Sequence, residues 1–160
     1  MSSKEGEGAV AQTLANILVH VIFSTKERRH LIKADVREAL HAYMAGTLNN
    51  LDSPCLAIGG TSNHVHLLTA LSKKTALSEV VGQLKKSSSK WIKTKGPAYA
   101  HFAWQEGYGA FSIGRSQVEA LKRYIASQEE HHKTKSFEAE LIATLKKYAV
   151  VYDEQHLWTC

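Results

Sequence analysis

Two histidines, His64 and His66, stand one residue apart in the stretch GGTSNHVHLLTAL at residues 59–71. The apolar residues around them are typical of a β-strand, in which alternate side chains point to the same side. Both imidazoles therefore share one face with Leu68, while Val65 and Leu67 point to the other. Two imidazoles on one face can bind a single divalent metal ion through neutral nitrogens. The alternative is a pair of hydrogen-bonded histidines at a half-exposed sheet edge.

A second set of reactive side chains lies in RYIASQEEHHK at residues 123–133. Tyr124, Gln128 and His131 are spaced four and three residues apart, so a helix would place them on one narrow strip. This strip would offer a nucleophile, a further metal ligand and an imidazole. The alternative for Tyr124 is a boundary tyrosine whose hydroxyl faces water.

The apolar stripe of the same helix, formed by Val118, Leu121 and Ile125, lies immediately beside that strip. Packing of the stripe against a sheet would aim the strip along the seam between them. His132 falls within the apolar stripe and is therefore predicted to be structural, whereas His131 lies nearer to Tyr124.

The elements that must position these residues follow from hydrophobic periodicity and turn residues. Residues 14–25 predict a buried strand, residues 53–60 and 63–71 a hairpin across Gly59 to Asn63, and residues 102–114 a strand or bent hairpin. Helices are predicted over residues 34–50, 75–94, 116–132 and 137–150, with Ser116 and Glu119 forming a capping box. This order predicts an α+β, ferredoxin-like (RRM-like) antiparallel sheet with helices on one face, plus a C-terminal tyrosine-bearing helix.

Composition narrows the class of protein. The chain has 160 residues, a formal net charge of +5 and two cysteines, Cys55 and Cys160, which have no metal-binding spacing. No apolar run is long enough to span a bilayer. We therefore expect a flexible lead-in at residues 1–13, one domain over residues 14–160, a cytoplasmic location and a bias toward a polyanionic partner.

Several ordered motifs together resemble one family. The paired histidines resemble the histidine-hydrophobe-histidine (HUH) signature of single-strand DNA nucleases. YIASQEEHH resembles the tyrosine helix of single-tyrosine HUH transposases of bacterial insertion sequences and their REP-associated relatives. The segments VHVIFSTKERR, KKSSSKWIK, FAWQEGYGAFSIGRS and YDEQHLW also look like family segments, so the resemblance runs from about residue 14 to the end.

The resemblance implies that His64, His66 and Gln128 bind Mg²⁺ or Mn²⁺ and that Tyr124 attacks the scissile phosphate. Tyr124 would then be joined to the 5′ end of the cut strand, and a 3′-hydroxyl would later reopen that bond. The acceptor of the tyrosine proton stays open between metal-bound water and His131. In the relatives an acidic residue often precedes the first histidine, but this chain has Asn63.

The resemblance further implies single-stranded DNA carrying imperfect hairpins as the partner, and a homodimer whose tyrosine helix could complete the active site in trans. The candidate phosphate contacts are basic residues after the first strand and on the second long helix, namely Lys26, Arg28, Arg29, Lys85, Lys86 and Lys90. A solvated basic face is the alternative for each of them. Trp91 is predicted to pack in the core, and Tyr108 and Phe111 are undecided.

Two other functions remain open from the sequence. The chain could be a domesticated hairpin-binding protein without strand transfer, or a metal-dependent phosphoesterase that uses water in place of the tyrosine. Intact Tyr124, His64, His66 and Gln128 favour the transposase.

Overall fold

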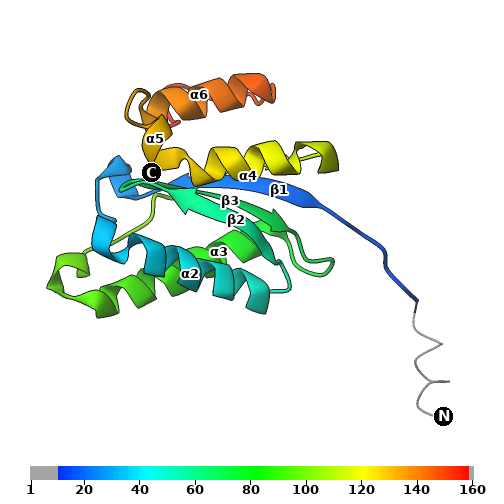
Figure 1. Ribbon diagram of the computed structural model, residues 1–160, viewed down its shortest axis with the longest axis horizontal. Helices are drawn as coiled ribbons and strands as arrows, with labels where there is room; N and C mark the ends of the chain where they lie inside the picture. Colours follow the sequence, from blue (N-terminus) through cyan, green and yellow to red (C-terminus); the bar gives the residue numbers. More distant parts are fainter. Residues whose placement is uncertain (1–10, 159–160) are drawn as a thin grey trace, which may run out of the picture.

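A four-stranded antiparallel sheet forms the centre of the computed structural model, which describes residues 11–158 (Figure 1). The strands are β1 (Leu18–Ser24), β2 (Cys55–Gly60), β3 (His64–Ala70) and β4 (Gly109–Ser112), in the spatial order β2-β3-β1-β4. The α-helices are α2 (Ala34–Asn50), α3 (Leu77–Ile92), α4 (Val118–Ala126), α5 (Gln128–His131) and α6 (Phe137–Lys147). Short 3₁₀ helices are η1 (Lys26–Arg28), η2 (Lys93–Lys95), η3 (Pro97–Tyr99) and η4 (Arg115–Gln117). The predicted α+β ferredoxin-like fold is confirmed.

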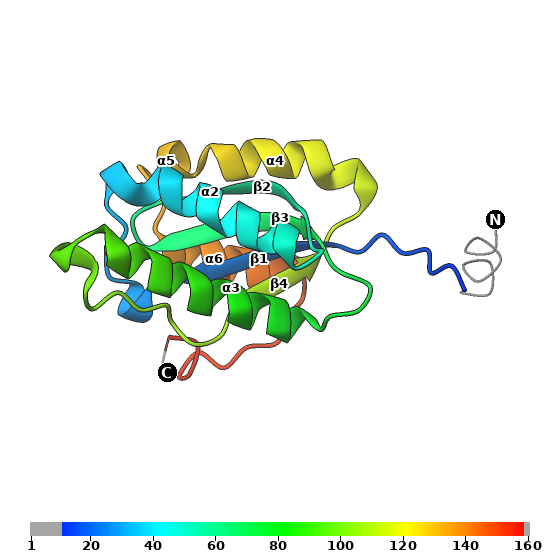
Figure 2. The same cartoon turned by 90° about the horizontal axis from the view of Figure 1, so that it is seen from below.

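Helices cover both faces of the sheet. Helices α2 and α3 lie together on one face, while α4, α5 and α6 lie on the other (Figures 1 and 2). The predicted helices on one face are α2 and α3. The tyrosine-bearing helix α4 lies on the opposite face with α5 and α6, so the fold has three layers. Every residue of β1 is buried because the strand is covered on both sides.

The alternation of side chains along the strands divides the core in two. Val21, Val65 and Leu67 pack with α2 and α3 in the larger cluster. Leu68 packs with Ile125 of α4 in a smaller cluster on the opposite face. His64 and His66 point to that second face, as the strand periodicity predicts.

The helix predicted over residues 116–132 is broken. Helix α4 ends at Ala126, Ser127 has φ −100° and ψ 19°, and α5 begins at Gln128. The predicted capping box of Ser116 and Glu119 is wrong, because the backbone N–H of Gly114 donates to the side-chain oxygen of Gln117 at 3.0 Å, and the short helix η4 starts there.

The aromatic segment before the tyrosine helix forms less strand than predicted. Only Gly109–Ser112 pairs along β1, and a single bridge joins Thr25 to Trp104. Phe111 is buried and stacks on Tyr148, whereas Tyr108 is 39% exposed. Trp91 stacks on Tyr43 with ring centroids 5.1 Å apart and is partly buried against the core, as predicted.

Residues 11–17 are exposed and form no helix or strand, whereas residues 1–10 of the predicted lead-in and Cys160 lie outside the described residues. Within residues 11–158, no helix combines the length and apolar character needed to cross a bilayer.

Candidate active site

The paired histidines lie on β3 beneath the C-terminal helices. Both are fully buried, and their ring centroids are 5.2 Å apart. They face α4, α5 and α6 and not solvent, which removes the alternative of a half-exposed pair at a sheet edge. The predicted shared face is confirmed by this geometry.

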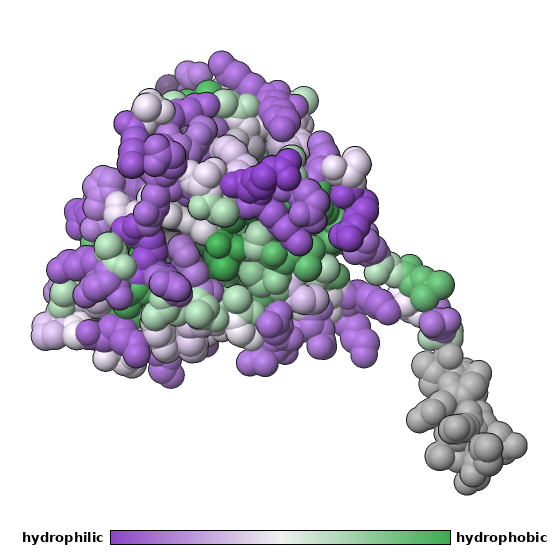
Figure 3. Space-filling model, viewed as in Figure 1, coloured by the Kyte–Doolittle hydropathy of each residue, from purple (hydrophilic) through white to green (hydrophobic). Residues whose placement is uncertain are grey.

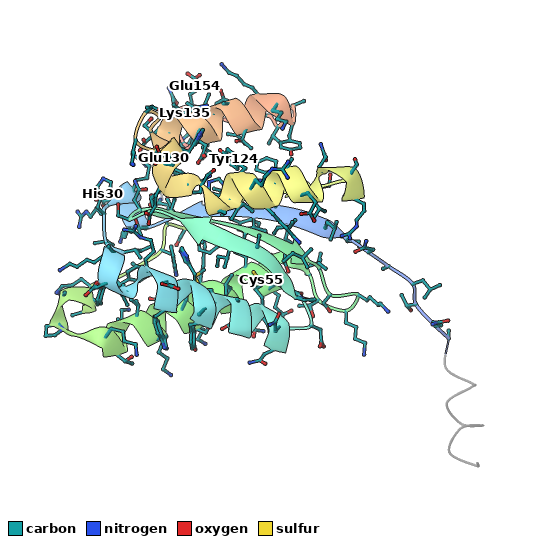
Figure 4. The ribbon with its side chains drawn as sticks, viewed as in Figure 1. His30, Cys55, Tyr124, Glu130, Lys135 and Glu154 are labelled. Atoms are coloured by element: carbon teal, nitrogen blue, oxygen red, sulfur yellow. The ribbon has the colours of Figure 1, made fainter. Side chains whose placement is uncertain are left out.

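The strip of Tyr124, Gln128 and His131 meets the histidines despite the break at Ser127. The Tyr124 ring centroid lies 5.7 Å from that of His66, and the Gln128 Oε1 lies 3.0 Å from the His64 Nε2. The His131 Nε2 lies 3.5 Å from the Tyr124 hydroxyl oxygen. Figure 4 places Tyr124 on α4 in the space facing α6. A single chain therefore brings the tyrosine to its own histidines.

The carboxylate of Glu140 lies at the centre of the site, and it was not predicted from the sequence. Its Oε1 is 2.8 Å from the His66 Nε2, while its Oε2 accepts hydrogen bonds from the Tyr124 hydroxyl and the Gln128 amide. A signal for it did exist. Glu140 falls within the buried stripe of α6, three residues after Phe137 and five before Leu145.

His132, predicted to be structural, contacts the candidate site directly. Its Nε2 lies 3.0 Å from the Glu140 Oε1, and its ring lies 4.4 Å from that of His64. The potential ligand atoms of His64, His66, His132 and Glu140 all lie within 4.8 Å of one another and could hold a metal ion.

Neighbouring side chains fix the orientation of the paired histidines. The Asn63 Oδ1 lies 2.8 Å from the His64 Nδ1, and the Asn63 amide donates to the Arg28 carbonyl. An amide oxygen can only accept, so a hydrogen on the His64 Nδ1 satisfies this contact and leaves the Nε2 lone pair toward the site. Asn63, the residue that departs from the family pattern, therefore orients a candidate metal-ligating histidine.

His20 lies beside the Nδ1 of His66, as Asn63 lies beside the Nδ1 of His64. His20 was not predicted from the sequence. Its Nε2 lies 2.9 Å from the His66 Nδ1, and the two rings stack. A neutral imidazole has one N–H, so the contact with His20 determines whether the His66 Nε2 donates to Glu140 or presents a lone pair there. Such hydrogen bonds to the outer nitrogen orient histidine ligands in metal sites.

Burial keeps the imidazoles of His20 and His64 neutral. It lowers the pKa of His64 to about 3, with a smaller contribution from the nearby His66, and that of His20 also to about 3. Burial opposes ionisation of Glu140, but hydrogen bonds from His66 and Tyr124 hold its pKa below the ordinary value. Burial and the Glu140 carboxylate raise the pKa of Tyr124. The nucleophile candidate is therefore a protonated phenol that donates to a carboxylate.

The donor set fits a divalent metal. The His64 Nε2 lone pair faces the Gln128 Oε1 at 3.0 Å, a contact between two acceptors that a cation between them would satisfy. Ligand atoms at right angles around an ion with bonds of about 2.1 Å lie about 3.0 Å apart. The contacts from the Glu140 Oε1 to His66 and His132, at 2.8 and 3.0 Å, match that spacing. Nitrogen donors combine here with amide and carboxylate oxygens.

Two cavities flank the site. One of about 460 Å³ lies between α4 and α6 and reaches Tyr124, Glu140, Lys135 and Lys147. The other, of about 480 Å³, lies on the side of Asn63 and His132 and includes Arg28, Arg37 and Lys133. Both offer cationic side chains beside the tyrosine and the histidines.

The predicted DNA-contacting residues fall in two separate places. Lys26, Arg28 and Arg29 follow β1, near Asn63, and Arg28 pairs with Glu138 of α6 at 2.7 Å. The other three lie on α3, across the sheet from the tyrosine, and there Lys86 and Lys90 are exposed. The Lys85 ammonium donates to the carbonyls of Gln105 and Gly107, so it ties the loop before β4 to α3.

Two solved structures resemble the fold. One is described as a transposase from Deinococcus radiodurans R1, with 18% identity, a TM-score of 0.58, and coverage of 74% of this chain and 95% of the other. The second is described as a REP-associated tyrosine transposase bound to a REP hairpin, with 13% identity, a TM-score of 0.57, and coverage of 77% and 73%. No curated protein matches the chain.

The family model of IS200-like transposases matches residues 13–128, which include β1, the paired histidines of β3, Tyr124 and Gln128. This match covers well over half of the sequence and contains the elements that meet at the site. The chain belongs to the IS200-like transposase family.

Proposed function

We propose that this transposase cleaves and rejoins single-stranded DNA through a covalent 5′-phosphotyrosine at Tyr124, with a divalent metal held by His64, His66 and Gln128. The observation that carries the proposal is the meeting of the Tyr124 hydroxyl with a buried cluster of imidazoles and one carboxylate within a single chain. Mg²⁺ and Mn²⁺ are the ions we propose. When bound, a divalent ion supplies Lewis-acid chemistry, because its charge offsets that of the phosphate and of the departing 3′-oxygen.

The side chains of the site carry out the attack on phosphorus and the proton transfers. The Tyr124 oxygen attacks the phosphorus, the bond from phosphorus to the 3′-oxygen breaks, and the 3′-oxygen takes up a proton from the site and leaves as a hydroxyl. The tyrosine proton passes into the site, where the Glu140 Oε2 already accepts the hydroxyl and the His131 Nε2 lies 3.5 Å away. In the return step a 3′-hydroxyl attacks the phosphotyrosine and Tyr124 regains its proton. The stored bond allows strands to be joined without ATP.

We propose imperfect DNA hairpins as the recognised partner. The similar structure bound to a REP hairpin supports this, as does the placement of basic side chains on both sides of the sheet. Phosphate contacts of this kind would position the DNA without reading its sequence.

We also propose that residues 14–160 form one domain and that two copies of the chain form a homodimer. An apolar strip lies over β2 between α2 and α4 (Figure 3), and β2 pairs only with β3, which leaves its other edge unpaired within residues 11–158. Leu56, Ala57 and Ile58 of this strand are partly exposed. Such an edge can add a strand from a second copy. Completion of the site in trans stays a prediction.

The test is covalent capture of labelled single-stranded DNA that carries a hairpin, in the presence of Mn²⁺. We expect a denaturation-resistant adduct with the unaltered protein and none with Tyr124→Phe, which still binds the hairpin. Tyr43→Phe is the matched control, because Tyr43 stacks on Trp91 in the layer formed by α2 and α3. Cleavage that survives in Tyr124→Phe would indicate a phosphoesterase, and binding without an adduct by the unaltered protein would indicate a hairpin-binding module.

A further inference from the structure

Glu140 is not among the site residues that the family resemblance implies. It lies on α6, twelve positions beyond Gln128, where the family match ends. Its two oxygens face different partners. Oε1 points to the imidazoles of His66 and His132, at 2.8 and 3.0 Å, and Oε2 points to the Tyr124 hydroxyl.

The burial of this carboxylate requires compensation. Glu140 is 2% exposed, and its ion pairs within residues 11–158 are all with histidines. A buried carboxylate costs several kcal/mol unless an opposite charge and hydrogen bonds offset the lost hydration. Hydrogen bonds from imidazoles offset part of this cost, whereas a divalent cation supplies a full opposite charge.

The contacts of His64 also favour a cation at this position. Its Nδ1 lies 2.8 Å from the Asn63 Oδ1, and its Nε2 lies 3.0 Å from the Gln128 Oε1 and 3.6 Å from the Glu140 Oε1, so acceptor oxygens face both ring nitrogens. One hydrogen on a neutral imidazole cannot satisfy the acceptor oxygens that face its two nitrogens, so an acceptor-to-acceptor contact remains that a cation at Nε2 would relieve. A network that served packing alone would leave this contact repulsive.

We propose that Glu140 is an anionic ligand of the divalent ion through Oε1 and holds the Tyr124 hydroxyl through Oε2. The inference rests on the proposed function only for the role of Tyr124 as the nucleophile. Helix α6 thereby joins the metal to the nucleophile with one side chain. A carboxylate also changes the charge of the ion's ligand set from neutral to −1, which strengthens retention of the ion.

The proposed ligand set favours Mn²⁺. Carboxylate and amide oxygens suit Mg²⁺ and Mn²⁺, whereas imidazole nitrogens suit transition metals. A set of two imidazoles, one amide oxygen and one carboxylate oxygen therefore binds Mn²⁺ more tightly than Mg²⁺.

Calorimetric titration of the metal-free protein with MnCl₂ tests the inference without DNA. We expect Glu140→Gln to weaken Mn²⁺ binding at least tenfold and to remove most of the Mn²⁺-induced rise in the melting temperature. Glu140→Asp, which keeps the carboxylate, should recover part of the affinity. The control is Glu119→Gln, which makes the same chemical change at an exposed position of α4 and should match the unaltered protein. Mn²⁺ affinity of Glu140→Gln within twofold of the unaltered protein overturns the inference.

A crystal of the unaltered protein soaked in MnCl₂ decides the matter even if Glu140→Gln fails to fold. We expect the anomalous peak of manganese within bonding distance of a Glu140 oxygen and of the Nε2 atoms of His64 and His66. A peak more than about 3.5 Å from the carboxylate, or no peak at this site, contradicts the inference. The two proposals fail separately, because Glu140-dependent Mn²⁺ binding without any DNA adduct refutes only the proposed function, and an adduct with Glu140-independent binding refutes only this inference.

Discussion

At the scale of the residue, Asn63 controls which nitrogen of His64 faces the site. Its Oδ1 accepts from the His64 Nδ1 at 2.8 Å, and the hydroxyl of Thr61 lies 3.0 Å from the same nitrogen. An acidic residue at position 63 would accept the same hydrogen bond. Asn63 is therefore a neutral substitute that keeps the orientation of the histidine and removes one negative charge beside it.

Replacement of Asn63 by the similarly sized Leu should weaken Mn²⁺ binding about tenfold, because outer hydrogen bonds to a histidine ligand contribute 10- to 100-fold to metal affinity. Calorimetric titration checks this. Asn63→Asp keeps the acceptor and should bind Mn²⁺ at least as tightly as the unaltered protein. Equal affinity of Asn63→Leu and the unaltered protein would show that Asn63 has no orienting role.

His41 on α2 is expected to make the folded protein less stable in acid. It is neutral in the fold because burial and the charge of Arg37 lower its pKa to about 4, and its Nε2 is buried without a hydrogen-bond partner in the described structure. The unfolded chain protonates this histidine near pH 6.5. Below that value the unfolded state binds the extra proton, so stability falls as pH drops toward 4 and is fully present above 6.5.

The expected contribution of His41 is a loss of about 2 kcal/mol between pH 7.5 and pH 5. His41→Leu should therefore flatten the pH dependence of the unfolding free energy by that amount. Urea titrations of both proteins at several pH values, with a chelator present, measure it. The same slope in both proteins would mean that His41 titrates normally in the fold.

Four site residues were predictable, because short-range periodicity places them. His64 and His66 follow from the two-residue repeat of a strand, and Tyr124 and Gln128 from the four-residue repeat of a helix. Glu140 and His20 were not predicted, since their roles depend on how α6 and β1 pack against β3. The place of Glu140 in the apolar stripe of α6 indicates burial, but local spacing does not say which residues of β3 it would face.

At the scale of the element, the tyrosine helix is positioned by a close approach to β2. A Cβ added to Gly59 would lie 2.3 Å from the Ile125 carbonyl oxygen, which belongs to the backbone of α4. Only glycine allows this contact, and Ile125 is the residue after the nucleophile candidate. The hairpin therefore fixes the height of α4 above the paired histidines.

Gly59→Ala should displace α4, cost about 1–3 kcal/mol of unfolding free energy and reduce the rate of adduct formation more than hairpin binding. Gly46→Ala is the control, since nothing lies within 4 Å of its added Cβ and the position is helical, so it should be neutral or stabilising. Chemical denaturation and adduct kinetics measure both effects. A Gly59→Ala protein with unaltered stability and rate would refute the positioning role.

The order of the elements was readable from the sequence, but two details were not. The break at Ser127 could not be predicted, because no proline or glycine lies near it. The layering was also underspecified, since an amphipathic helix does not reveal which face of a sheet it will cover. The largely apolar character of residues 18–24 was the one indication that both faces would be covered.

At the scale of the whole molecule, the sheet separates the tyrosine from the basic residues of α3. Lys86 and Lys90 are exposed in one layer, and Tyr124 lies in the other. If both regions contact DNA, the substrate must pass around an edge of the sheet, and the α3 lysines would hold the hairpin while the cleaved strand reaches Tyr124.

Replacing Lys86 and Lys90 with Gln should therefore weaken hairpin binding and make its salt dependence shallower, by about 0.9 in logarithmic slope for each phosphate that is no longer neutralised. Adduct formation at saturating DNA should keep its rate, because neither lysine lies in the catalytic layer. Binding isotherms at several salt concentrations measure the slope. Lys74→Gln, at an exposed position before α3, should leave it unchanged, and an unchanged slope in the double variant would remove α3 from the DNA-binding surface.

The central claim is that Tyr124 becomes joined to the 5′ end of the cut strand. Tryptic digestion of the adduct tests it directly, since cleavage after Arg123 and Lys133 releases residues 124–133, a peptide whose one tyrosine is Tyr124. We expect mass spectrometry to find this peptide carrying the DNA fragment that lies 3′ of the cut, linked through a 5′-phosphate. An adduct on any other peptide, a 3′-phosphate linkage, or the absence of an adduct at saturating hairpin DNA and Mn²⁺ would contradict the account.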